Sequence, residues 1–357
     1  MSHEVPWIAA LRPYVTAKHQ AWERLDAKRD VLKLDWNEST VSPTPLVKER
    51  IVQALEGLRI NWYPDVQNNV LKEKIAEYVG EEIDCVDYFA SSDSLHEYVL
   101  KCFSSREHPV LMFHPTYDNF RASAEAQGAP VTRLPIQALY ANASKVISES
   151  GANLVYLCNP NNPTGQELEI DDLEVLIRKF PGKLFVIDEA YYEFSGKTVA
   201  PLVSRLSNVI CCRTFSKAFG IASFRVGYAV AHPSLISVLS KVKNHKNIAA
   251  LSQIAAIACL DDVGYMRQQV KEVLLAKSSF ALFLERCSYV MQVYRGGGNF
   301  LLFTLAEHAV RRLVSHLEAH DIFVREFQHI PNSIRITIGT PGQMKVVQSA
   351  FERFSVD

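Results

Sequence analysis

The stretch CCRTFSKAFGIASFRVGYA, Cys211 to Ala229, places one lysine, Lys217, directly after an apolar run. Thr214 and Ser216 stand just before this lysine, and Arg225 follows it eight residues later. The run that leads into it, NVICCRTFS, is continuous and rich in β-branched residues, as in a strand buried on both faces. A lysine that serves only solubility does not need hydroxyl groups and a second cation as neighbours. The stretch therefore predicts a functional amine at the end of a buried strand.

Three more apolar runs of this kind precede it, at Val110–Pro115, Asn153–Pro160 and Lys183–Ala190. Between them lie helix candidates such as EIDDLEVLIRKF, whose Leu173 and Ile177 recur at helical spacing. Strands buried on both faces belong to parallel sheets covered by helices. The fold class predicted is α/β, with a large domain at residues 45–255 built on a mostly parallel sheet.

The segments on either side of this domain lack its regular alternation of buried strands and helices. Residues 256–357 contain a long helical stretch at about 265–287, followed by mixed strands and helices, which predicts a smaller α+β domain. Residues 1–44 form an N-terminal arm that contains Trp7, Trp22 and Trp36. We expect this arm to pack on the small domain and on a dimer partner.

Composition excludes several classes of function. The net charge of −1 and the absence of a long basic run argue against binding to nucleic acid or to an anionic membrane. The N-terminus lacks the pattern of a signal peptide, and the longest apolar run, Ile254–Leu260, is too short to span a bilayer. Seven cysteines without a Cys-x-x-Cys pair suggest reduced thiols in a cytoplasmic protein and no metal site.

Polar groups follow three of the predicted strands: NPNNPTG at Asn159–Gly165, DEAY at Asp188–Tyr191, and TFSK at Thr214–Lys217. Ligands of open α/β sheets bind outside the carboxyl ends of the strands. A fourth segment sets Ser92 and Asp93 at the start of an amphipathic helix, where backbone N–H groups attract an anion. An amine, an anion site and a carboxylate at one sheet edge meet the requirements of pyridoxal phosphate.

The segments YPD, PTY, NPNNPTG, DEAY, TFSKAFG and IRITIGT occur in this order over residues 30–340. In this order they resemble fold-type-I, class I/II pyridoxal-phosphate-dependent aminotransferases, most closely histidinol-phosphate aminotransferase. The resemblance implies a homodimer with shared active sites. It also implies transfer of an amino group from an amino compound, with histidinol phosphate as leading candidate, to a 2-oxo acid such as 2-oxoglutarate.

The resemblance also implies roles for single residues. Lys217 would bind the cofactor aldehyde and carry the proton, and Asp188 would pair with the pyridine nitrogen. Asn162 and Tyr191 would hold the ring hydroxyl, and Tyr117 would stack on the ring. The cofactor phosphate would be bound by several polar side chains: Ser92, Asp93, Thr214, Ser216, Arg225 and, from the other subunit, Tyr63.

For the substrate, the resemblance implies that Arg335 clasps a carboxylate with its planar fork. Arg325 is a second candidate for an anion, and Asn37 is a further candidate for substrate contact. Histidinol phosphate lacks an α-carboxylate, so Arg335 would have to meet its phosphate instead. From the residues alone, the alternation of Arg335 with three isoleucines fits a pocket and a solvent-facing position equally.

Other interpretations remain open. Tyr63 and Tyr117 fit simple packing aromatics, and Gly296–Gly298 fits a loop. Ser91, His245 and Lys246 depart from the family pattern, so the donor is not fixed by the resemblance. The same motifs suit a decarboxylase of the threonine-phosphate type, an aminotransferase of specialised metabolism, or a non-catalytic member of the fold.

Overall fold

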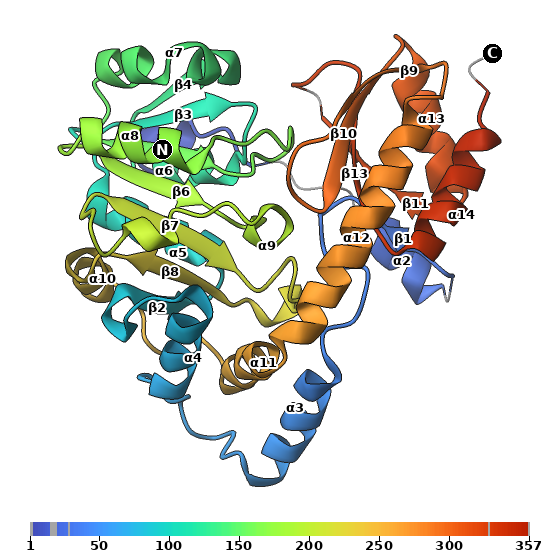
Figure 1. Ribbon diagram of the computed structural model, residues 1–357. Helices are drawn as coiled ribbons and strands as arrows, with labels where there is room; N and C mark the ends of the chain where they lie inside the picture. Colours follow the sequence, from blue (N-terminus) through green and yellow to red (C-terminus); the bar gives the residue numbers. More distant parts are fainter. Residues whose placement is uncertain (1–2, 15–19, 28, 328, 356–357) are drawn as a thin grey trace.

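The computed structural model describes residues 3–14, 20–27, 29–327 and 329–355. Two lobes are visible in Figure 1: a larger one around a seven-stranded sheet and a smaller one around a four-stranded sheet. This architecture is the predicted α/β fold, with a mostly parallel sheet in the large lobe.

The order of the large sheet is β2-β8-β7-β6-β5-β3-β4. Only β8 runs against its neighbours, so the carboxyl ends of the other six strands meet at one edge. That edge is where the predicted polar segments emerge. The strands are β2 (Val86–Phe89), β3 (Val110–His114), β4 (Val131–Pro135), β5 (Leu154–Cys158), β6 (Leu184–Asp188), β7 (Val209–Thr214) and β8 (Gly227–Ala231).

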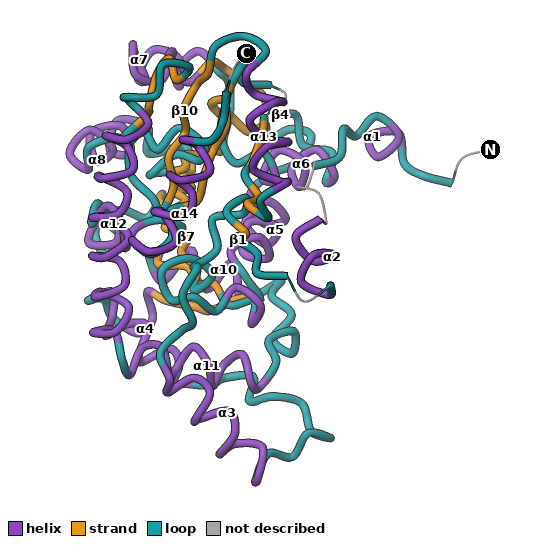
Figure 2. The backbone as a smooth tube through the Cα atoms, turned by 90° about the vertical axis from the view of Figure 1, so that its right-hand side faces the viewer, coloured by secondary structure: helices purple, strands orange, loops and turns teal. Residues whose placement is uncertain are grey.

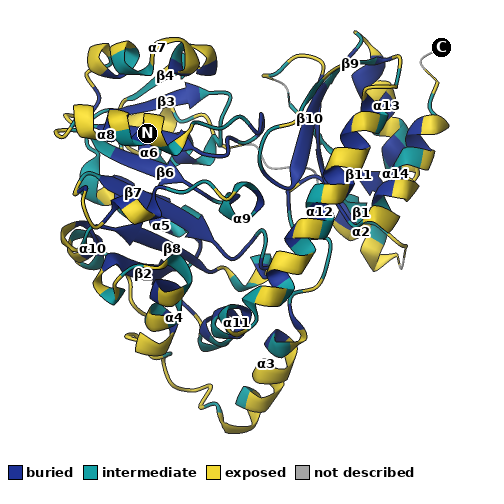
Figure 3. Cartoon of the chain, in the orientation of Figure 1, coloured by how far each residue is buried: buried dark blue, intermediate teal, exposed yellow. Residues whose placement is uncertain are grey.

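Helices cover both faces of this sheet, since its central strands are buried throughout (Figure 3). Each face has its own cluster of apolar side chains. One face packs against α5 (Ser92–Phe103), α6 (Asn119–Ala126) and α10 (Pro233–Ser240). The other packs against α4 (Asn69–Val79), α7 (Ile136–Glu149), α8 (Ile170–Lys179) and α11 (Ala250–Asp261). Shorter helical turns are α9 (Tyr192–Ser195), η1 (Ile83–Cys85), η2 (Ala200–Leu202) and η3 (Ala222–Phe224).

The small lobe is an antiparallel sheet of order β12-β13-β10-β9, covered on one side by three helices. Its strands are β9 (Val290–Tyr294), β10 (Phe300–Leu305), β12 (Arg325–Glu326) and β13 (Ser333–Thr337). Its helices are α12 (Val263–Leu284), α13 (Ala309–Ala319) and α14 (Pro341–Glu352). A separate parallel pair joins β1 (Leu32–Lys33) to β11 (Ile322–Phe323).

The expected arm of residues 1–44 divides between the lobes. Its strand β1 joins the small lobe, and α2 (Gln20–Asp26) lies beside it in Figure 1. In contrast, α1 (Pro6–Ala9) lies against α6 of the large lobe, where the Trp7 Nε1–H donates to the Ala126 carbonyl at 3.2 Å (Figure 2). The later part of the arm therefore packs on the small domain, as expected, whereas α1 packs on the large lobe.

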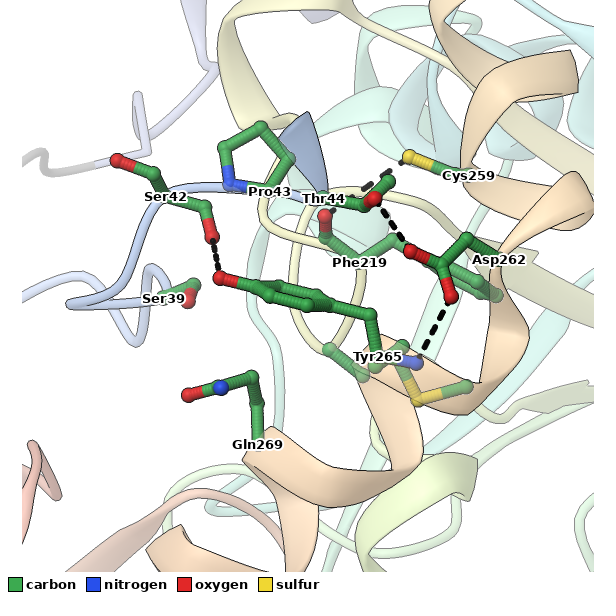
Figure 4. A pocket seen from close by; sticks show the side chains of 11 residues that line it. Ser39, Ser42, Pro43, Thr44, Phe219, Cys259, Asp262, Tyr265 and Gln269 are labelled. Carbon is green, nitrogen blue, oxygen red and sulfur yellow. Dashed lines mark hydrogen bonds between the residues drawn. The ribbon is translucent and has the colours of Figure 1, made fainter. Parts of the chain in front are cut away.

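The expected boundary at residue 255 falls inside α11. This helix packs on α3 (Pro45–Gly57) and α4, so the large lobe extends to the end of α11 at Asp261. After β1, the chain passes between the lobes at residues 34–44 and again at the α11–α12 junction. The two crossings are tied together by hydrogen bonds from Thr44 to Asp262 and from the Tyr265 hydroxyl to the Ser42 carbonyl (3.2 Å), as Figure 4 shows.

A small pocket opens at these crossings, lined by residues that include Ser39, Ala218 and Gln269. None of the predicted site residues lines it, although Ala218 directly follows Lys217. Over the part of the chain that is described, no helix has both the length and the apolar character needed to cross a bilayer.

Candidate active site

Lys217 lies just beyond the carboxyl end of β7, where the two lobes meet. Its Nζ donates to the Trp36 carbonyl at 2.9 Å and lies 5.9 Å from the centroid of the Tyr191 ring. Burial lowers the pKa of Lys217 to about 8, and the positive charge of Arg335 adds to this effect. A larger share of this amine is therefore neutral and nucleophilic near pH 8 than of a free lysine.

Asp188 ends the neighbouring strand β6 and is only 3% exposed. Its Oδ2 accepts a hydrogen bond from the Tyr156 hydroxyl at 2.7 Å, and its Oδ1 accepts one from the Ala190 backbone N–H at 3.1 Å. The Nε2 atom of His96 lies 3.5 Å from the same Oδ2. The structure thus places a buried carboxylate, with donors behind it, one strand away from the lysine.

Tyr191 follows Asp188 by three residues and is held by two amides. Its hydroxyl oxygen accepts from Asn37 Nδ2 at 2.9 Å and from Asn162 Nδ2 at 3.3 Å. Burial raises the pKa of Tyr191, so the phenol stays protonated. Because both amides donate, the hydroxyl keeps its own hydrogen for another acceptor. Asn37 is itself fully buried, and its Oδ1 accepts from Thr337 at 3.1 Å.

The predicted anion site lies at the start of α5. Asp93, in the first turn, is 3.4 Å from the guanidinium of Arg225, whose Nη1 lies 3.5 Å from the Ser216 hydroxyl. The Ser216 backbone N–H donates to Thr214 Oγ1 at 3.1 Å. Tyr117 reaches this group as well, since its hydroxyl donates to Asp93 Oδ1 at 2.8 Å.

Two backbone features shape this turn. Ser91, the N-cap of α5, has a φ of 95° and accepts a hydrogen bond from the Ser94 N–H at 3.2 Å. Gly227, at the start of β8, lies so close that a Cβ there would be 2.5 Å from the Ser92 nitrogen. The backbone N–H groups of the turn are thereby held tightly against the sheet.

Arg335 lies on β13 of the small lobe, reaches Asn162 of the large lobe, and is 6% exposed. Its Nη1 donates to Asn162 Oδ1 at 2.6 Å and its Nη2 donates to the Asp35 carbonyl. Its Nε is buried with no hydrogen-bond partner among the described residues. Burial lowers the pKa of Arg335, and Arg325 lies directly opposite it on β12.

Ser92 and most other predicted site residues are thus brought to one region, but Tyr63 is not. Tyr63 lies on the loop between α3 and α4 and is 75% exposed. Its ring contacts Lys246, whose Nζ is 4.7 Å from the ring centroid. Within one chain, Tyr63 touches none of the groups around Lys217 that are described above.

Three residues near the site escaped the sequence interpretation: Tyr14, His96 and Tyr156. The Tyr14 ring lies 6.0 Å from the Tyr117 ring, edge-on. Burial raises the pKa of Tyr14, against the smaller opposing effect of the charges of Arg325 and Arg335. In the sequence, Tyr156 is one residue of an apolar run that predicts a buried strand. Its contact with Asp188 depends on the pairing of β5 with β6, which a single sequence does not display.

Comparison with known proteins identifies the group to which these features belong. The family described as "Aminotransferase class I and II" matches residues 29–351. A dihydroxyacetone phosphate transaminase of Campylobacter jejuni is 39% identical over 98% of this chain and 96% of its own length. A histidinol-phosphate aminotransferase of a Geobacillus species is 30% identical over 94% of this chain and 93% of its own.

The solved structures agree. The histidinol-phosphate aminotransferase of Sinorhizobium meliloti, in complex with pyridoxal-5'-phosphate, superposes with a TM-score of 0.86 at 26% identity, covering 98% of this chain and 97% of that one. The L-threonine-O-3-phosphate decarboxylase of Porphyromonas gingivalis, at 21% identity, 90% and 98% coverage and a TM-score of 0.78, shares the fold.

Proposed function

Because the chain belongs to the class I and II aminotransferases, which are pyridoxal-phosphate-dependent enzymes, we propose that it aminates a small phosphorylated carbonyl compound. Dihydroxyacetone phosphate is the first candidate, since the relative of that name matches nearly the whole chain at 39% identity. The amino group would come from an amino acid such as glutamate, leaving 2-oxoglutarate.

The residues at the sheet edge fit the cofactor. The N–H groups of the α5 turn, Ser216 and Arg225 would hold its phosphate, with Thr214 orienting Ser216. The fit is supported by Gly227, whose missing side chain lets β8 lie against the turn without covering it. Asp93 would orient Arg225 and Tyr117, because it contacts both.

Pyridoxal phosphate, when bound, supplies an aldehyde that takes up the amino group and a ring that accepts electrons from the substrate carbon. Lys217 would bind that aldehyde through Nζ and, once released, move the proton at the substrate carbon. Asp188 would hold a proton on the ring nitrogen. Tyr191 would donate its hydroxyl hydrogen to the ring oxygen, with Asn162 and Asn37 fixing its position.

The observation that carries the substrate class is the buried guanidinium of Arg335, whose Nε has no hydrogen-bond partner in the described part of the chain, with Arg325 opposite it. A buried cation with an unused donor is costly unless an anion completes it. Two adjacent arginines suit a phosphate, which carries close to two negative charges. In the other half-reaction, Arg335 would bind the carboxylate of the amino acid.

Histidinol phosphate, the donor expected from the sequence, stays the second candidate, supported by several relatives of that name. In histidinol phosphate and in the amine formed from dihydroxyacetone phosphate alike, the reacting carbon bears a CH2–O–phosphate arm. Neither compound has a carboxylate on that carbon. The same two arginines therefore serve either compound. The two compounds differ in the other substituent of this carbon, which is an imidazolylmethyl group in one and a hydroxymethyl group in the other.

Half-reactions followed by the visible absorbance of the bound cofactor test this proposal. We expect glutamate and 2-amino-3-hydroxypropyl phosphate to bleach the band, and the unphosphorylated amine to react about 100-fold less efficiently, as loss of a charge-assisted contact of about 3 kcal/mol predicts. Equal efficiency with and without the phosphate would reject the substrate class. Arg335→Ala should abolish the preference, whereas Arg295→Ala, which removes a surface ion pair with Glu285, should not.

The same assay separates the alternatives. Faster reaction with histidinol phosphate would reverse the order of the two candidates. Carbon dioxide released from O-phosphothreonine without any oxo acid would favour the decarboxylase. A purified chain that shows no absorbance band after incubation with pyridoxal phosphate would favour a non-catalytic member of the fold.

We also propose that the enzyme is a homodimer whose partner supplies Tyr63. The support is the exposed apolar surface from α3 to the start of α4, which includes Ile60 at 82% exposure and Trp62 at 65%. Exposed apolar surface of this kind usually marks an interface, and two-fold dimers are the commonest oligomers. A cytoplasmic location and a role in biosynthesis are expectations of the same proposal.

A further inference from the structure

His96 is a buried imidazole that the proposed mechanism does not use. It projects from the second turn of α5 and is 0% exposed. Aromatic rings surround it: Phe120 at 5.2 Å, Tyr156 at 5.6 Å and Tyr117 at 6.5 Å between centroids. Neither ring nitrogen has a hydrogen-bond partner among the described residues. The nearest carboxylate oxygen is Asp188 Oδ2, 3.5 Å from Nε2.

An apolar side chain at this position would avoid the cost of burying two unsatisfied polar atoms, which is about 1–3 kcal/mol for each group. The aromatic surroundings would accept leucine or isoleucine without any polar group to satisfy. A use for the imidazole therefore has to come from the carboxylate beside it, that of Asp188. With the proton on Nε2, the ring has a donor 3.5 Å from the oxygen that already accepts from Tyr156.

We propose that His96 is a positioning residue that, together with Tyr156, stabilises the ionised form of Asp188 and so keeps the proton on the ring nitrogen of the cofactor. This rests on the proposed pairing of Asp188 with that nitrogen. The proton shared between a carboxylate and a pyridine resides on the nitrogen only if the resulting ion pair is favoured. Hydrogen-bond donors near Oδ2 of Asp188 favour this ion pair, because they stabilise the negative charge of the carboxylate in a buried site.

The geometry gives this donor a specific place. Asp188 Oδ1 accepts from the Ala190 N–H, whereas Oδ2 accepts from the Tyr156 hydroxyl and lies 3.5 Å from His96 Nε2. His96 also lies one turn after the phosphate-binding start of α5. A shift of this helix on phosphate binding would therefore change the 3.5 Å contact directly.

The test compares His96→Leu and His96→Gln in holoenzyme loaded with pyridoxal phosphate labelled with 15N in the ring. Leucine removes the donor at similar volume, whereas glutamine keeps an N–H near the position of Nε2. We expect the 15N shift of His96→Leu to move towards the unprotonated value, with kcat falling about 10-fold or more and KM for glutamate little changed. His96→Gln should recover much of both losses.

A second readout separates this role from packing. Apo His96→Leu should unfold at the wild-type temperature or above it, since an unsatisfied polar group has been removed. Val99→Ala, one turn further along the same helix and equally buried, should lower that temperature and leave the 15N shift unchanged. An unchanged 15N shift in His96→Leu, or a glutamine variant no better than leucine, would overturn the proposal.

Asp188→Asn is the reference that keeps the two proposals distinct. If this variant leaves the ring nitrogen protonated, the proposed role of Asp188 fails, and the inference about His96 fails with it. If Asp188→Asn deprotonates the nitrogen and His96→Leu does not, only the inference about His96 is wrong.

Discussion

The reactivity of Lys217 is set by where its amine lies. A neutral amine is the form that attacks an aldehyde, and burial beside Arg335 lowers the pKa of Lys217 to about 8. Deprotonation is thereby favoured in the folded protein, because the charged form has lost water and gained a repelling neighbour. The carbonyl of Trp36 is the only hydrogen-bond acceptor that the structure assigns to Nζ within the described residues.

The lowered pKa of Lys217 predicts how the rate at which the apoenzyme binds the cofactor depends on pH. The rate of appearance of the visible band should rise as the pH passes through about 8 and level off above it. For a model lysine whose α-amine is blocked, and whose side chain has a pKa of about 10.4, the rate of reaction with the cofactor should still be rising at pH 9 to 10. Stopped-flow absorbance from pH 6 to 10 measures both. An apoenzyme profile that follows the model lysine would contradict the lowered pKa.

That Lys217, Asp188 and Asn162 lie at one edge of the sheet could be predicted from the sequence, because each sits in a short motif at the end of an apolar run. His96 and Tyr156 could not be found this way. Their contacts with Asp188 depend on a helix crossing the sheet and on strand register, and neither leaves a periodic signal in one sequence.

At the scale of elements, the start of α5 depends on its neighbour β8. A Cβ at Gly227 would lie 2.5 Å from the Ser92 nitrogen and 2.7 Å from the Ser91 carbonyl carbon, so the turn would have to move. We expect Gly227→Ala to weaken pyridoxal phosphate binding by 10-fold or more, measured by equilibrium dialysis. Gly182→Ala, where a Cβ meets nothing within 4 Å, is the matched control and should bind normally.

Ser91 affects the stability of the same turn in two opposite ways: its backbone is strained, but its side chain caps α5. Its φ of 95° and ψ of 163° lie in a region that side chains avoid, at a cost of about 1–3 kcal/mol. Ser91→Gly should relieve that strain and lose only a few tenths of a kcal/mol of capping. Part of the gain is offset because glycine gives the unfolded chain more conformational entropy. The expected net effect is stabilisation by about 0–1.5 kcal/mol in urea unfolding.

Ser91→Ala separates the two contributions. It keeps the strained backbone and loses the hydrogen bond from the Ser94 N–H, so it should destabilise the protein by about 1 kcal/mol. Equal destabilisation by glycine and alanine would show that the cap, and not the strain, governs this position.

At the scale of the whole molecule, the predicted runs correspond closely to β3, β5, β6 and β7, because central parallel strands are apolar throughout. The sheet's edge strand β4 was not singled out, since its side chains are half-buried or exposed and leave no continuous apolar run. The boundary expected at residue 255 falls inside α11, and only Asp262 separates α11 from α12, so no linker marks the change of lobe in the sequence.

The exposed loop between α3 and α4 carries the remaining test of the whole assembly. If Tyr63 serves the partner's site, mixing Tyr63→Phe with Lys217→Ala subunits gives mixed dimers in which one site carries both lesions and the other neither. Random exchange of equal amounts should restore about a quarter of the wild-type activity, because half the dimers are mixed and one of their two sites is intact.

Lys217→Ala mixed with Asp188→Asn provides the control for that experiment. Both residues lie in one chain's site, following the adjacent strands β7 and β6, so every site in a mixed dimer keeps one lesion and no activity should return. Recovery in the first mixture and none in the second requires that Tyr63 crosses the interface while Lys217 and Asp188 do not. With subunit exchange verified by mass-tagged chains, failure of the first mixture to recover would assign Tyr63 to its own chain, and the exposed apolar surface around it would then need another partner.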